Sequence, residues 1–348
     1  MLFRSTAFFF RDANGLPYPA FANPHTGSYL GTVSSTGWLG GLTRALHGGW
    51  PINPFGSYLL ELGASWAIVM TLTGLYLWWP RNGNGLGGVL YPRLRAGPRT
   101  FWRDLHATVG VYFALIFLAF LCSALPWTTL WGGKILGAIQ NVTGQQSPTA
   151  SFFARGGDHH HAVAPGTAAR HHAHHDGGAH ARTLDELVAA ARAAGAHGTI
   201  EVQVPRDGAP VNVRDEHPRA PREVWLQLDR HSGAVLTRVV WEDFPLLSRL
   251  VALGIDLHEG KFFGRANQVF NTLLAAALVC LSVTGVIGWY KRRPQGGAMA
   301  PPRRAARYPR AVIATGATLA VALPLFGLSV LAIALIDQVL GRFLRGSL

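Results

Sequence analysis

Three histidines lie where long apolar segments begin or end, and their side chains are the strongest candidates for chemistry in this 348-residue sequence. His47 and His258 each come shortly before an apolar segment, whereas His106 lies at the start of another. Imidazole is a natural axial ligand for haem iron, and ionisable side chains at membrane depth are functional candidates. We therefore take these three histidines as candidate haem ligands. The alternative is that they only cap helices or contact lipid headgroups.

An internal repeat relates two of these histidines. The segments Leu46–Gly49 and Leu257–Gly260 share the pattern Leu-His-x-Gly, and His47 and His258 are 211 residues apart. The same spacing pairs further residues: Thr73 with Thr284, Gly74 with Gly285, and Trp78 with Trp289. Pseudo-two-fold packing of the two copies would turn His47 and His258 toward one haem b on the outer side of a membrane. His106 would need a partner histidine on a helix missing from this chain, so only the outer pair is complete.

Basic side chains accompany the paired histidines and could bind the propionates of a haem. The candidates are Arg44, Lys261 and Arg265. Contacts between interfacial basic residues and lipid headgroups explain the same three positions equally well.

A second match lies upstream of each Leu-His-x-Gly segment. Asn23–Gly27 and Asp229–Gly233 both open with Asn or Asp and end with Gly, a pattern typical of a tight turn between two strands. We therefore predict that His25 and His231 are turn residues and not ligands.

Four apolar segments must position the histidines. Hydrophobic residues make up 49% of the chain and charged residues only 14%, well below the usual quarter. Each segment has enough apolar residues to cross the hydrocarbon core, and Pro324 is expected to kink the last one. The predicted transmembrane helices are 57–79, 105–130, 265–290 and 311–336.

The charge distribution predicts the orientation of these helices. Arg and Lys cluster in the loops 80–104 and 291–310, which places both loops in the cytoplasm by the positive-inside rule. The formal net charge of +13 is explained in this way, and we predict no nucleic-acid binding. Residues 1–56, the inserted domain 131–264 and the tail 337–348 are then periplasmic. No signal peptide precedes residues 1–56, which predicts that a first helix is missing upstream.

The inserted domain contains a histidine-rich tract at 158–180 that cannot bury a core and is predicted to be disordered. Its histidines are His159, His160, His161, His171, His172, His174, His175 and His180. They could bind soft or borderline divalent metals weakly, or the tract could be a functionless solvated loop.

An α+β module is predicted after the tract. Thr183 and Glu186 form a capping-box pattern that opens a helix. The strand-like stretches that follow it are 199–204, 211–213, 224–229 and 235–241.

These features together resemble the PepSY-associated transmembrane helix family, also called iron-regulated membrane proteins. The matching segments are LHGG at 46–49, LTGLYLWWPR at 72–81, FWRDLHATVG at 101–110, LHEGKFFGRANQ at 257–268 and the helix-plus-sheet module. Some members are haem-containing reductases of ferric siderophores in the bacterial inner membrane. The resemblance therefore implies His47, His106 and His258 as haem ligands. The first family helix, with its own histidine, is absent here, and the histidine tract is not part of the shared pattern.

The predicted fold is a membrane helical bundle of four transmembrane helices with an inserted α+β periplasmic PepSY-like domain, built by internal duplication. The predicted function is haem-b-dependent electron transfer in the inner membrane that reduces a periplasmic ferric siderophore or other iron chelate. An inner-membrane or cytoplasmic protein would donate the electrons. The alternative is a non-enzymatic, membrane-anchored PepSY module that binds metal or modulates a partner protein.

Overall fold

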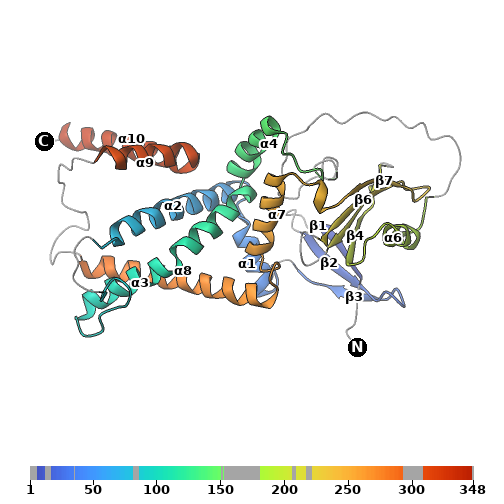
Figure 1. Cartoon of the computed structure of the whole chain (residues 1–348), viewed down its shortest axis with the longest axis horizontal. Coiled ribbons are helices and arrows are strands. Elements are labelled where there is room, and N and C mark those ends of the chain that lie inside the picture. The colour runs from blue at the N-terminus through green and yellow to red at the C-terminus, as the bar shows by residue number, and fades with distance from the viewer. Residues whose placement is uncertain are drawn as a thin grey trace. The chain divides into compact units, whose positions relative to one another are not determined.

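A computed structural model describes residues 6–11, 17–34, 36–80, 86–149, 152, 181–205, 209–216, 222–292 and 309–346. Its contacts divide the chain into two compact units, Met1–Ala64 and Ser65–Leu348, and each unit is described by itself. Figure 1 shows both units and labels many of their helices and strands. The predicted histidine tract, with its eight candidate metal ligands, lies outside the described residues.

The first unit contains a three-stranded antiparallel sheet, a short helix and the start of a long helix. The elements are β1 (Thr6–Arg11), β2 (Pro17–Ala22), β3 (Tyr29–Thr32), α1 (Leu39–His47) and the beginning of α2 (Phe55–Trp78). The strand order is β1-β2-β3, and each strand pairs with its neighbour in sequence. α1 ends at His47, so the first candidate ligand is the last residue of a helix.

The second unit is mainly helical. Its helices after α2 are α3 (Pro98–Ala124), η1 (Leu125–Trp127), the π-helix η2 (Trp131–Leu136), α4 (Gly137–Thr143), α6 (Leu184–Ala193), η4 (Trp241–Asp243), α7 (Leu246–His258), α8 (Arg265–Arg292), α9 (Arg310–Ala322) and α10 (Pro324–Gly346). The most extensive contact between two of these helices joins α3 to α8. Phe117, Leu274 and Ala277 form the buried core of this contact. The α3–α8 pair is therefore the main scaffold of this unit.

Among the residues that the structure describes, three helices are long and apolar enough to cross a membrane, or four if α9 and α10 together form one crossing. The three continuous segments are Phe55–Trp78, Pro98–Trp127 and Arg265–Lys291. The second begins seven residues earlier than the predicted 105, because Pro98 starts the helix at a position where a missing N–H does no harm. His106 is therefore the ninth residue of α3 and lies well inside the helix.

The last predicted helix differs from the expectation of a single kinked span over 311–336. α9 and α10 meet at Pro324 with their axes bent by 119°, and α10 continues beyond residue 336 to Gly346. Pro324 cannot continue the hydrogen-bond ladder of α9, so the chain turns there and starts a new helix. Leu323 and Phe326 at this turn are buried against Ile68 and Leu125, which stabilises the bend.

The predicted α+β module is confirmed between residues 181 and 243. Helix α6 packs on the antiparallel sheet of β4 (Thr199–Gln203), β5 (Val211–Glu216), β6 (Val224–Leu228) and β7 (Val235–Val239), in the order β4-β5-β6-β7. Leu187 and Ala191 of α6 meet Val213, Leu226 and Leu228 of the sheet in a buried core. The module has its own hydrophobic core, because one face of the helix and alternate residues of the strands are apolar.

The capping box of α6 is also confirmed, and it gives a testable prediction for stability and pH. Thr183 Oγ1 accepts a hydrogen bond from the Glu186 backbone, and the Thr183 N–H donates to Glu186 Oε2 at 2.8 Å. We expect Thr183→Ala to destabilise α6 by about 1 kcal/mol. The Thr183 backbone N–H, then Arg182 and the Thr183 hydroxyl, lower the pKa of Glu186. The ionised carboxylate of Glu186 therefore stabilises α6 fully above its ordinary pKa of about 4.3. This stabilisation is lost as the pH falls through the lowered pKa of the folded protein.

Amide hydrogen exchange of α6 in the full-length protein measures both effects. Thr183→Ala should speed exchange near neutral pH. Glu186→Gln should abolish the additional opening of α6 that we expect in the wild-type protein on acidification. Unchanged exchange in both variants would contradict this role of the capping box.

Two hairpins, one in each unit, share their detailed geometry. The carboxamide of Asn23 accepts from the His25 N–H at 2.9 Å, and the carboxylate of Asp229 accepts from the His231 N–H at 3.0 Å. Gly27 and Gly233 close the two turns with φ values of 66° and 72°, which favour glycine. The pairing register shifts at the equivalent bulges Phe21/Ala22 and Gln227/Leu228. The prediction that His25 and His231 are turn residues is confirmed.

The two Leu-His-x-Gly segments also share their backbone geometry. α1 and α7 both end at the histidine, and Gly49 and Gly260 follow with φ values of 94° and 75°. Three hydrogen bonds from a backbone N–H to a carbonyl oxygen recur in the two segments. Gly48 to Arg44 corresponds to Glu259 to Ile255, Gly49 to Leu46 corresponds to Gly260 to Leu257, and Trp50 to Ala45 corresponds to Lys261 to Asp256. Each segment therefore presents its histidine from the same local backbone.

Candidate functional site

His106 is held against α8 by two hydrogen-bonding partners. Its Nδ1 lies 3.0 Å from the hydroxyl of Thr284 and 3.1 Å from the carbonyl oxygen of Leu281. The backbone of Gly285 lies under the ring, where a Cβ would be 3.5 Å from Cε1 of His106. The residue as a whole is exposed although it lies inside a candidate membrane segment. An exposed imidazole at this depth is expected to be covered by a cofactor or another helix and not by lipid.

His258 lies near the other end of the same helix pair. Its ring stacks on Phe120 of α3, with centroids 4.0 Å apart and planes inclined by 21°, and Trp127 lies beside it with centroids 6.3 Å apart. Asn271 of α8 donates to the His258 carbonyl oxygen at 2.9 Å. Gly254 of α7 packs closely against Ser123, which lets α7 approach α3. The ring is thus placed by aromatic packing and the backbone by a side-chain amide.

The α3–α8 pair connects the two histidines. His106 and Phe120 are 14 positions apart on α3, which corresponds to about 21 Å along a helix and nearly four full turns. Both residues therefore lie on nearly the same face of α3. The apolar contact of Phe117 with Leu274 lies between them. We call this contact line, from His106 to Phe120 along α3, the α3–α8 seam. It holds one imidazole at each end, separated by most of the thickness of a bilayer core.

His47 belongs to the first unit and is exposed at the end of α1. Arg44, one turn earlier, is also exposed. The pairing of His47 with His258 around one haem stays a prediction, as does a propionate contact from Arg44. The matched backbone geometry of the two Leu-His-x-Gly segments is compatible with equivalent roles for the two histidines.

The other two propionate candidates flank the loop after His258. The Lys261 ammonium forms an ion pair with Glu259 at 2.6 Å. Arg265 is exposed and lines an open hollow on α8 together with Gln268, Val269, Thr272 and Leu273. Of the two side chains, Arg265 is the better placed to bind an anionic group, because Lys261 already has a carboxylate partner.

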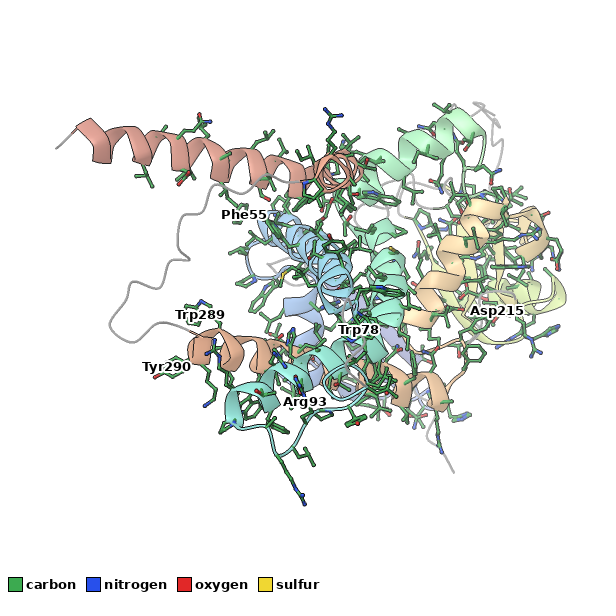
Figure 2. All side chains as sticks on the ribbon, turned by 60° about the vertical axis from the view of Figure 1, so that its left-hand side comes forward. Phe55, Trp78, Arg93, Asp215, Trp289 and Tyr290 are labelled. Carbon is green, nitrogen blue, oxygen red and sulfur yellow. The ribbon has the colours of Figure 1, made fainter. Side chains whose placement is uncertain are left out.

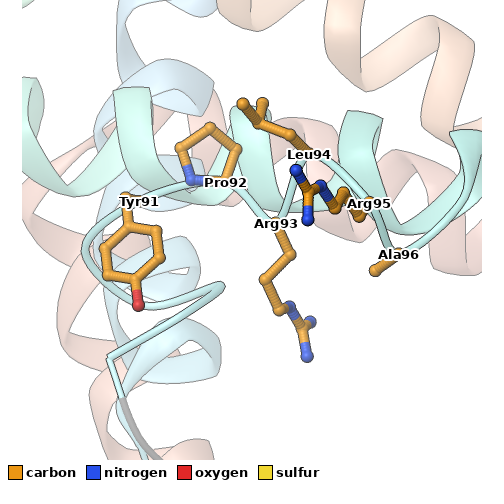
Figure 3. A pocket seen from close by; sticks show the side chains of 6 residues that line it. All are labelled: Tyr91, Pro92, Arg93, Leu94, Arg95 and Ala96. Atoms are coloured by element: carbon orange, nitrogen blue, oxygen red, sulfur yellow. The ribbon is translucent and has the colours of Figure 1, made fainter.

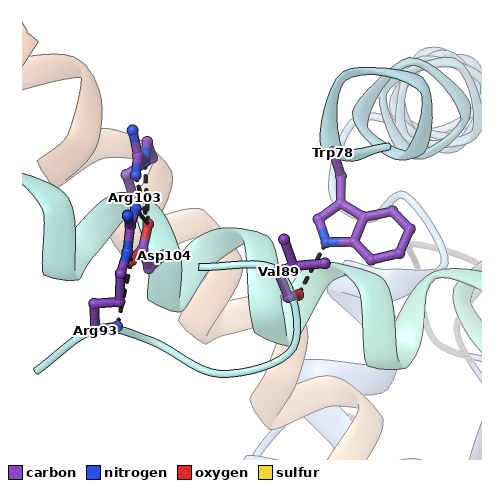
Figure 4. A network of polar contacts seen from close by, with 5 residues as sticks. All are labelled: Trp78, Val89, Arg93, Arg103 and Asp104. Atoms are coloured by element: carbon purple, nitrogen blue, oxygen red, sulfur yellow. Dashed lines mark hydrogen bonds and ion pairs between the residues drawn. The ribbon is translucent and has the colours of Figure 1, made fainter. Parts of the chain in front are cut away.

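An ion cluster not anticipated from the sequence fixes the start of α3 (Figure 4). The carboxylate of Asp104 is only 1% exposed and accepts from Arg93 Nε at 2.7 Å and Arg103 Nη2 at 2.8 Å. Trp78 Nε1 also donates to the Val89 carbonyl oxygen at 3.0 Å, which ties the loop to the end of α2. The cluster positions the helical turn that precedes His106. The sequence predicts only a cytoplasmic location for the loop 80–104 and not this structural role.

The same loop forms a second open hollow (Figure 3), lined by Tyr91, Pro92, Arg93, Leu94, Arg95 and Ala96. Arg93 is engaged with Asp104, and Arg95 is exposed. The hollow is open and mostly apolar apart from these two arginines, which could attract anionic headgroups or an acidic protein surface.

The donor groups of this site suit haem iron better than a bare metal ion. Within the described ranges, no three His, Cys, Asp or Glu side chains gather to hold a metal. A porphyrin occupies four positions on its iron and needs only one or two protein ligands, which single imidazoles supply. His106, whose Nδ1 is hydrogen-bonded and whose residue as a whole is exposed, fits this requirement.

The aromatic ends of the helices fit a bilayer. Trp289 and Tyr290 project from the C-terminal end of α8 (Figure 2) and are 47% and 56% exposed. Aromatic side chains at this position are typical of the membrane interface. With several apolar helices, the chain is a multi-pass membrane protein that requires a lipid environment.

Comparison with known families defines the class of protein. The PepSY-associated TM region matches residues 5–292, which cover most of the chain and include all three candidate haem ligands. The chain belongs to this family. A comparison with curated proteins finds no match for it.

Proposed function

We propose that this protein carries electrons across the bacterial inner membrane through haem b and reduces a ferric siderophore or another iron chelate in the periplasm. The observation that carries the proposal is the α3–α8 seam, which holds an imidazole at each of its two ends. Each end lies within or beside apolar helices that span a bilayer, and helical bundles commonly hold cofactors between facing side chains. Family membership supports a membrane protein linked to iron, because members are known as iron-regulated membrane proteins.

A haem bound at such a site would supply one-electron redox chemistry. In this proposal His258, and with it His47 of the other repeat, would bind a haem at the periplasmic side. His106 supplies a ligand at the cytoplasmic side. The fold's contribution is to orient the imidazoles and to place them at the two ends of the seam, where His106 and Phe120 are about 21 Å apart along α3. One electron from a reduced cytoplasmic or membrane donor would convert one Fe³⁺ of the chelate to Fe²⁺.

The repeat supports the pairing of the outer histidines. We propose that the two hairpins, the two Leu-His-x-Gly segments and the helices that follow them arose by internal duplication. Their recurring hydrogen bonds, bulges and positive-φ glycines support this origin. The basic loops 80–104 and 291–310 support a cytoplasmic location for those segments.

A non-enzymatic role for the α+β module is the alternative. The module has its own buried core and could act as a membrane-anchored binding domain. That role requires no haem and leaves the seating of His106 on Thr284 without a purpose. The two functions therefore make opposite predictions for the spectrum of the protein.

An absorption spectrum of the protein purified with added haem tests the proposal. We expect a Soret band that shifts on reduction with dithionite and returns when a ferric chelate is added. A folded protein that retains no haem after purification with added haem would overturn the proposal and favour the binding-module alternative.

A further inference from the structure

The Thr-Gly step of α8 is a repeated motif whose purpose the sequence alone does not explain. Thr284 and Gly285 lie directly under His106, the hydroxyl at one ring nitrogen and the glycine under the ring. Thr73 of the other copy makes the same two backbone contacts as Thr284, to the carbonyls three and four residues earlier. The repeat therefore preserves the orientation of the hydroxyl.

The hydrogen bonds of Thr284 fix the direction of its proton. Its Oγ1 lies 2.7 Å from the carbonyl oxygen of Cys280 and 3.2 Å from that of Leu281. Carbonyl oxygens only accept, and a threonine hydroxyl inside a helix commonly donates to the carbonyl four residues earlier, so the single hydroxyl proton is assigned to the Cys280 carbonyl. Toward His106 the hydroxyl can then offer only a lone pair. The Leu281 carbonyl, 3.1 Å from Nδ1, is likewise an acceptor.

Two acceptors around one ring nitrogen require that nitrogen to carry a proton. In the neutral imidazole, the other nitrogen is then unprotonated and has a lone pair available for a metal. Histidines that bind metals usually donate their second N–H to a carbonyl or a similar acceptor, which fixes both the tautomer and the ring direction. Gly285 borders the ring on the α8 side, where a Cβ would come into ordinary contact with Cε1 of His106 at 3.5 Å.

We propose that Thr284 is a positioning residue that holds His106 as the Nδ1-protonated tautomer and presents its Nε2 as an iron ligand. The identity of the metal group rests on the proposed function. The tautomer follows from the hydrogen bonds alone. Thr284 acts through His106 and does not itself touch the cofactor.

Haem affinity measures the first part of this proposal. Measured in a His258→Ala background, so that the His106 end is observed by itself, Thr284→Val should weaken haem binding roughly 10- to 100-fold. Thr284→Ser keeps a hydroxyl and should restore the affinity. Thr71→Val is the matched control, because Thr71 makes the same type of backbone bond in α2, at 2.7 Å to Ala67. It should bind haem as its background does. Equal affinity of the Thr284→Val and Thr71→Val proteins would overturn the proposal.

The tautomer of His106 is measured separately by ¹⁵N NMR of the haem-free wild-type protein, with His106→Gln identifying the signal. Protonation at Nδ1 is the expected result, and protonation at Nε2 would overturn the proposal. A protein that binds no haem but shows the Nδ1-protonated ring would contradict the proposed function and leave the positioning role of Thr284 standing. The same spectrum serves if Thr284→Val fails to fold.

Discussion

Replacing His258 with alanine should lower the haem bound at its end of the α3–α8 seam by at least about tenfold, because an axial ligand contributes no less than its outer-shell partners. The ring of His258 is stacked on Phe120, and Asn271 holds its backbone carbonyl. These contacts preorganise the imidazole, so no other side chain can replace it without moving α7. The measurement is the haem-to-protein ratio of purified protein, followed through the amplitude of the Soret band.

Two controls separate lost ligation from lost folding. His231→Ala should keep the wild-type haem content, because His231 lies in the hairpin turn, where its backbone N–H makes the contact with Asp229. His258→Gly should regain haem when free imidazole is added, since the small side chain leaves room for an exogenous ligand. A His258→Ala protein with full haem content and an unchanged spectrum would contradict the assignment of His258.

Asp104→Asn should clearly destabilise the helical part of the second unit. The carboxylate is 1% exposed and accepts charged hydrogen bonds from Arg93 and Arg103. Its loss leaves two guanidinium groups near a neutral amide. Because their side chains are 43% and 65% exposed and can be solvated, we expect about 2 kcal/mol and not the larger cost of a fully buried pair.

Thermal unfolding in detergent micelles measures this effect. Arg95→Gln is a suitable control, because Arg95 lies on the same loop and lines the open hollow there. It should unfold at nearly the wild-type temperature. We also expect Asp104→Asn to weaken haem binding at His106, two residues further along α3. Wild-type stability of the Asp104→Asn protein would show that the cluster does not hold the loop to α3.

The features predicted well from the sequence are those set by local chemistry. The capping box of Thr183, the turns at Asn23 and Asp229, and the strand stretches depend on neighbouring residues, and the structure has them. The three continuous membrane helices follow from long apolar runs. Repeat spacing identified Thr284 and Gly285 as equivalent to Thr73 and Gly74. It could not assign a purpose, because that depends on the register of α8 against α3.

The features that could not be predicted depend on packing between distant segments. Pro324 was expected to bend one helix, but the angle of 119° depends on burial of Leu323 and Phe326 against α2 and the end of α3. The stacking of Phe120 on His258 brings together residues 138 positions apart. Arg93 and Asp104 both lie in the predicted loop 80–104, and only the folded loop brings them into contact.

Electron paramagnetic resonance of the oxidised, haem-loaded protein tests most directly whether the imidazoles of His106 and His258, at the two ends of the α3–α8 seam, bind haem iron. The expected result is a low-spin ferric signal typical of imidazole ligation, reduced by His258→Ala and by His106→Ala and unaffected by His231→Ala. A spectrum that shows only the high-spin signal of loosely bound haem, and that neither ligand substitution changes, would contradict haem ligation by these histidines.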